Sequence, residues 1–105
     1  MSLKNSEKKA LRRIAHHLDV VIQVGDKNVT DAVVAETDRA LRDHELIKVR
    51  IHSGEREDRV NLSDQLATAC DADVIQRIGK VTVLFRPNPK ADPKLSNLNR
   101  YAGGA

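Results

Sequence analysis

The side chains best suited to chemistry in this sequence are cations at helical spacing near its start. Lys8, Lys9, Arg12 and Arg13 fall within two turns of a helix that we expect over residues 6–18. Ammonium and guanidinium groups gathered in this way bind phosphate oxygens. A charged helix face is often only solvated, so the cluster is a candidate phosphate contact with solubility as the alternative role.

A second candidate anion site follows the apolar run of residues 20–24. Residues 25–28 read Gly-Asp-Lys-Asn, and we expect a helix to begin after Thr30. Such a strand-to-helix joint turns backbone N–H groups and the positive end of a helix toward solvent, where an anion can be held. Many joints of this kind contain a glycine and bind nothing, so an ordinary connection is the alternative.

The charge of the chain is distributed unevenly. The 105 residues carry a formal net charge of only +3. Residues 1–17 hold five lysines and arginines against one acid, and residues 86–105 hold four against one, which leaves the middle acidic. This asymmetry suits a localised contact with a polyanion better than a uniform basic coat. The sequence shows no signal-peptide pattern or membrane-length apolar run, so we expect a cytoplasmic protein without membrane contact.

Other chemistries find little support in the residues. Phe85 and Tyr101 are the only aromatic residues, so recognition by stacking bases on several rings is not available. We see no nucleotide-binding loop, nucleophile elbow or catalytic carboxylate pair, and therefore expect no enzyme, no cofactor and no small-molecule substrate. The histidines lack the spacing of metal ligands, and Cys70 has apolar neighbours, so we expect no metal site and a buried, unreactive thiol.

Hydrophobic spacing indicates the elements that must position these groups. The apolar run of residues 20–24 is typical of a strand covered on both faces. Thr30 is suited to cap the next helix. Residues 46–52 alternate, which predicts a strand with one buried face and a second face that carries Lys48, Arg50 and His52.

A third helix is expected over residues 55–70, with Leu62, Leu66, Ala69 and Cys70 inward. Strands at 73–78 and 81–85 then flank Gly79, which suits a type II′ turn. The order helix-strand-helix-strand-helix-strand-strand predicts an α/β fold, a mixed four-stranded sheet packed with helices. We expect residues 1–87 to form this domain and residues 88–105 to be a mobile basic C-terminal tail.

Four blocks of the sequence, in this order, resemble the YhbY family. They are IAH at 14–16, VGDKNVT at 24–30, LRDHELIKV at 41–49 and IGKVTVLFRP at 78–87. The family comprises small bacterial RNA-binding proteins made of a single CRM (chloroplast RNA splicing and ribosome maturation) domain, and the resemblance covers roughly residues 3–87. It implies a KH-like fold similar to the C-terminal domain of translation initiation factor 3. It also implies an assembly factor that binds rRNA in precursors of the large ribosomal subunit.

In KH-type loops two glycines flank two variable residues, and the loop lies against the nucleic-acid backbone. Gly25 matches the first glycine, whereas Asn28 replaces the second and Asp26 stands where lysine is common in the family. Because Asp26 repels phosphate, these departures predict weaker binding by the loop and an unchanged fold. The candidate RNA-binding residues are Lys4, Lys8, Lys9, Arg12, Arg13, Gly25, Asp26, Lys27, Asn28, Thr30, Lys48, Arg50, Lys80 and Arg86.

Two other functions stay open at this point. One is a general RNA-binding or RNA-chaperone module without a ribosomal role, and the other is a protein-interaction module. DNA binding is less favoured, although the charge is compatible with it. We expect the protein to be a monomer.

Overall fold

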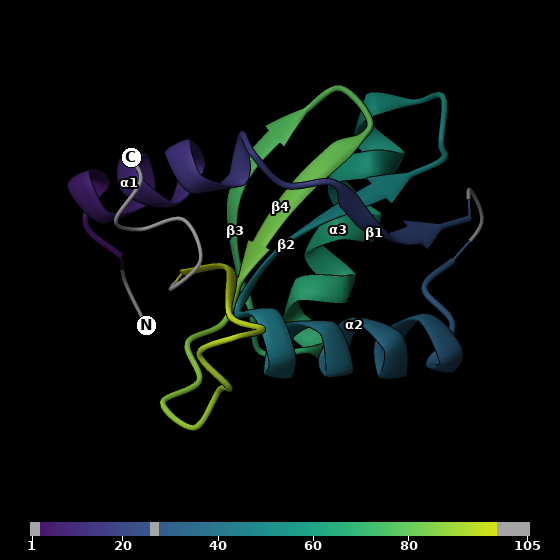
Figure 1. The fold of residues 1–105 in the computed structure, drawn as a ribbon. Coiled ribbons are helices and arrows are strands. Elements are labelled where there is room, and N and C mark those ends of the chain that lie inside the picture. The colour runs from purple at the N-terminus through teal and green to yellow at the C-terminus, as the bar shows by residue number, and fades with distance from the viewer. Residues whose placement is uncertain (1–2, 26–27, 99–105) are drawn as a thin grey trace.

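The computed structural model describes residues 3–25 and 28–98, which form one mixed sheet with helices on both faces (Figure 1). The strands lie in the order β1-β2-β4-β3; β1 and β2 are parallel, and β4 is antiparallel to both of its neighbours. This arrangement confirms the predicted fold class. None of the described helices is long and apolar enough to cross a membrane. The elements are α1 (Asn5–Ala15), β1 (Val20–Val24), α2 (Asp31–His44), β2 (Leu46–Ile51), α3 (Arg56–Ala69), β3 (Asp73–Ile78) and β4 (Val81–Phe85).

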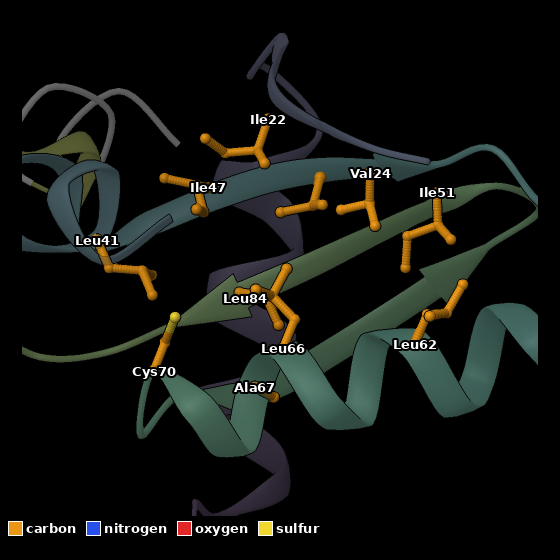
Figure 2. Packing of buried hydrophobic residues seen from close by; sticks show 11 residues of the cluster. Ile22, Val24, Leu41, Ile47, Ile51, Leu62, Leu66, Ala67, Cys70 and Leu84 are labelled. Atoms are coloured by element: carbon orange, nitrogen blue, oxygen red, sulfur yellow. The ribbon is translucent and has the colours of Figure 1, made fainter. Parts of the chain in front are cut away.

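The sheet separates two hydrophobic cores. The larger core lies between the sheet and the pair α2 and α3, where Leu41, Val49 and Leu66 are wholly buried (Figure 2). The smaller core forms on the opposite face, where Leu11 and Ile14 of α1 pack with residues of β2, β3 and β4. Because α1 packs mainly on β2 and β3 and on only part of this face, the rest of the face is not covered by any helix of residues 3–25 and 28–98.

The first helix differs from its prediction at both ends. It begins one residue early and has Lys4 as its N-cap, and the Lys4 backbone N–H donates to the Glu7 carboxylate at 3.3 Å. It ends at Ala15, three residues before the predicted Leu18, because the chain tightens into i→i+3 hydrogen bonds there. The second helix agrees with its prediction, and the Thr30 hydroxyl accepts the hydrogen bond of a first-turn N–H at 3.2 Å.

The prediction that β1 is covered on both faces is wrong. β1 is an edge strand whose Ile22 and Val24 are buried, while Val21 is 52% exposed and Gln23 faces solvent. A continuous apolar run does not reveal that α1 stops short of the strand's outer face. The open face of β1 therefore adjoins the open face of β2.

The end of α3 differs from its prediction at one inward position. Ala69 is exposed and Ala67 is buried in its place, so one inward residue was misassigned. Asp71 adopts φ of +53°, the left-handed conformation in which many helices end. Cys70 is buried as predicted; burial and then the Asp38 carboxylate raise the pKa of its thiol, although Arg86 partly opposes them.

Residues 88–98 do not agree with the mobile tail expected there. They fold back beside the junction of α2 and β2 (Figure 1), where Ser96 is fully buried. The Glu45 carboxylate accepts hydrogen bonds from the Asn88 N–H and the Ser96 hydroxyl, both at 2.6 Å. The Asn97 amide donates to the Leu46 carbonyl at 2.7 Å. Residues 99–105 lie outside the described residues, and the domain boundary at residue 87 stays a prediction.

Candidate nucleic-acid interface

An open groove of about 800 Å³ lies between the C-terminal half of α1 and the uncovered part of the sheet. Its position follows from the early end of α1, because the described part of this helix stops at Ala15 and does not reach the outer face of β1 and the adjoining part of β2. The cations that line it come from α1 and β2 and were all among the predicted contacts: Lys9, Arg12, Arg13, Lys48 and Arg50.

The alternation of β2 places its two cations in the groove. Ile47, Val49 and Ile51 point into the larger core, so Lys48 and Arg50 must point to the opposite face. Lys48 lies opposite Val20 and Arg50 lies opposite Gln23 in the parallel register with β1. The two cationic side chains therefore lie in a row beside β1, with Arg50 nearer than Lys48 to the Gly25 end of that strand.

Within the described residues, no groove cation takes part in a salt bridge. The salt bridges found within residues 3–25 and 28–98 join Arg42 to Asp43, Arg77 to Asp64 and Arg86 to Asp38. None of them involves a groove cation, and Asp19 is the single carboxylate among the lining residues. Unpaired cations gathered around an open groove attract a polyanion, and the attraction is strongest at low salt.

The sequence did not indicate the floor of this groove. Apolar side chains line it between the cations, and Ile78 is 62% exposed although it is a large aliphatic residue. Ile78 precedes the Gly79 turn and looks like an ordinary strand residue in sequence. The apolar lining residues are Ala15, Leu18, Val20, Ile78, Val81 and Val83.

Several predicted contacts lie away from the groove. Lys4, the N-cap of α1, and Lys8 on α1 do not line it, and Lys80 is exposed in the β3–β4 turn. Thr30 uses its hydroxyl as a helix cap. Asn28 is exposed beyond the far end of β1. Asp26 and Lys27 lie outside the described residues.

The structure gives Arg86 a different role from the predicted RNA contact. Its guanidinium donates to the Asp38 carboxylate at 2.7 Å, to the Cys70 carbonyl at 2.8 Å and to the Asp38 carbonyl at 3.0 Å. These bonds tie the end of β4 to α2 and to the end of α3. Arg86 is therefore a structural residue, and it does not line the groove.

We expect Arg86→Gln to lower the free energy of unfolding by about 1.5 kcal/mol, since hydrogen bonds from a charged group contribute more than neutral ones. Binding of a polyanion should stay unchanged. Urea unfolding and a binding titration on the same sample check both parts. Arg39→Gln, on the exposed side of α2, is the control with the same charge change. A stable Arg86 variant with weakened binding would restore the predicted contact.

His16 and His44 have different surroundings in the structure. His44 shares a 2.7 Å hydrogen bond between its Nδ1 and the Leu95 carbonyl, so it holds the C-terminal segment. His16 is exposed and lines the groove, which its sequence position did not indicate. A neutral or charged imidazole at that position can donate to a bound anion.

A family model, two relatives and one solved structure are similar to this chain over most of its length. Residues 3–86 match the model of the CRS1/YhbY (CRM) domain. A probable RNA-binding protein of Pseudomonas aeruginosa is 45% identical over 103 residues, which cover 98% of this chain and 99% of that protein. An RNA-binding protein of Haemophilus influenzae is 35% identical over 94 residues, which cover 90% and 95%. The solution structure of a candidate RNA-binding protein of Staphylococcus aureus superposes with a TM-score of 0.77 at 27% identity, covering 87% and 95%.

Proposed function

Because this chain belongs to the CRS1/YhbY (CRM) domain family, we propose that it is an RNA-binding protein and that the groove beside α1 is its RNA-binding surface. The observation that carries the proposal is the gathering of five cations, none in a salt bridge with a described residue, on a part of the sheet that none of the described helices covers. The names of the relatives support the same ligand.

The finer part of the proposal is a non-enzymatic role in assembly of the large ribosomal subunit, in the cytoplasm, with precursor rRNA as the partner. The support for it is the family resemblance. A cationic groove on a small domain suits reversible contact with an rRNA segment, because such contacts weaken as salt rises. A factor of this kind can release the RNA once ribosomal proteins compete for the same phosphates.

RNA binding itself is tested by measuring affinity for rRNA fragments over a range of salt concentrations. Each phosphate contact on single-stranded RNA contributes about −0.7 to the slope of log K against log salt, so five engaged cations predict a slope of about −3.5. A flat salt response would contradict a phosphate-dominated groove.

The ribosomal role needs a separate experiment in cells. The protein should sediment with precursor large subunits in a low-salt gradient and leave them as salt is raised. Deletion of the gene should cause those precursors to accumulate, most strongly in the cold, where misfolded rRNA rearranges slowly. A normal subunit profile, with the protein sedimenting free, would favour the general RNA-binding or RNA-chaperone alternative.

The loop at Gly25 provides a prediction that separates folding from binding. A Cβ at Gly25 would meet no atom within 4 Å, and its φ lies outside the left-handed region, so Gly25→Ala should leave stability unchanged or slightly raised. If RNA phosphate approaches this backbone, the added methyl group will lower affinity in a binding titration. Gly54→Ala is the matched control, because its Cβ is equally free and it lies in another loop.

A further inference from the structure

The floor of the groove has a property that phosphate binding does not require. Aliphatic side chains line the groove together with the cations: Ile78 is 62% exposed, Leu18, Val20 and Val81 are half-buried, and Ala15 and Val83 are buried. Phosphate contacts need only the five cations of the groove, which we call its rim. Exposed apolar surface beside several cations indicates a ligand with both a flat apolar part and an anionic part. A nucleotide whose base has left the helical stack has this composition.

The polar lining of the groove also departs from a pure phosphate site. Asp19 lies among five cations and would repel a phosphate placed beside it. It makes no salt bridge with any of them within the described chain. A carboxylate has two oxygens that accept hydrogen bonds and none that donates. Its presence suits a ligand part that carries N–H donors rather than charge.

We infer that the groove holds an unpaired guanine of an RNA strand, a conclusion that rests on the proposed function. The base would lie on the floor formed by Ile78, Val81 and Leu18, and the flanking phosphates would lie on the cations of the rim. Asp19 would accept hydrogen bonds from the N1–H and N2–H groups of the base. Guanine is the base whose Watson–Crick edge offers two adjacent donors, and in a duplex that edge is already paired.

The size of the groove agrees with this occupant. Its volume of about 800 Å³ falls in the range of sites that enclose an organic ligand, which leaves room for one base and its sugar. Lys48 and Arg50 continue along β2 beside β1 and can follow the backbone that leaves the groove. Binding would then combine a sequence-tolerant charge attraction with selection of one unpaired base.

The test uses three RNA hairpins that share one stem: fully paired, with one bulged guanine, and with one bulged adenine. Fluorescence anisotropy with the full chain should show about tenfold tighter binding of the guanine bulge than of either other hairpin, the size expected of one bidentate base contact. Asp19→Asn should abolish the preference for guanine over adenine. The control Glu36→Gln makes the same charge change on the exposed side of α2 and should retain it.

A second pair of variants tests the floor. Ile78→Thr should remove the preference for a bulged over a paired stem, whereas Val21→Thr, on an exposed residue outside the groove, should keep it. Equal binding of all three hairpins, with a steep salt dependence, would overturn the unpaired guanine and leave the proposed function intact. Failure to bind any of the hairpins or rRNA fragments would overturn both.

Discussion

Changing Arg12, Arg13 and Lys48 together to glutamine should lower RNA affinity about 100-fold in roughly 0.1 M salt. The estimate follows from counterion release, since at that salt concentration each phosphate contact on single-stranded RNA contributes a factor of about 5. The slope of log K against log salt should fall in magnitude by about 2. The three side chains lie outside both cores, so thermal stability should change little.

The control removes the same number of charges elsewhere. The exposed residues Arg39, Arg56 and Lys94 lie on α2, on α3 and in the C-terminal segment, and none lines the groove. Their change to glutamine gives the same net charge and should reduce affinity only slightly, through the weak long-range field. Equal losses in the two triple variants would mean that total charge, rather than the groove, determines binding.

The second large effect should come from Glu45, a buried residue that is 8% exposed. Glu45→Ala removes both carboxylate hydrogen bonds to the C-terminal segment and leaves the Ser96 hydroxyl buried without this partner. Hydrogen bonds to a charged group contribute about 1.5–3 kcal/mol each, so we expect the free energy of unfolding to fall by about 3 kcal/mol or more. Chemical denaturation monitored by circular dichroism measures this change.

Two further variants identify the cause of that loss. Glu45→Gln keeps one acceptor oxygen and the shape of the side chain, so its cost should be smaller. Ser96→Ala removes one donor and should cost about 1 kcal/mol. Faster amide exchange at Asn88 in Glu45→Ala would locate the damage in the C-terminal segment. An unchanged unfolding curve for Glu45→Ala would show that residues 88–98 contribute little to stability.

Local patterns predicted the element order because each signal acts over a few residues. The Thr30 cap, the alternation of residues 46–52 and the Gly79 turn each produced the expected structure. Long-range contacts were not predictable in this way. Glu45 adopts φ of +62°, which is unfavourable for a side chain of this type, and its partners lie about 40 to 50 residues away. Nothing near Glu45 in sequence indicates those partners.

The sequence indicated the charged residues of the candidate site but not their assembly, because assembly depends on long-range contacts. Charge and spacing indicated the cations of α1 and β2, but the sequence could not show that they share one groove. The pairing of β2 with the edge strand β1 and the early end of α1 bring them together. Arg86 shows the opposite case, because its charge fits the pattern of an RNA contact while its guanidinium donates a hydrogen bond to Asp38, far away in sequence.

The central claim, that RNA occupies the groove between α1 and the sheet, is tested most directly by NMR titration of the isotope-labelled chain with an rRNA fragment. The account predicts the largest amide shift changes at Leu18, Val20, Lys48, Arg50 and Ile78, with little change on the exposed sides of α2 and α3. Shift changes concentrated on α2 and α3, with the groove residues unaffected, would contradict it.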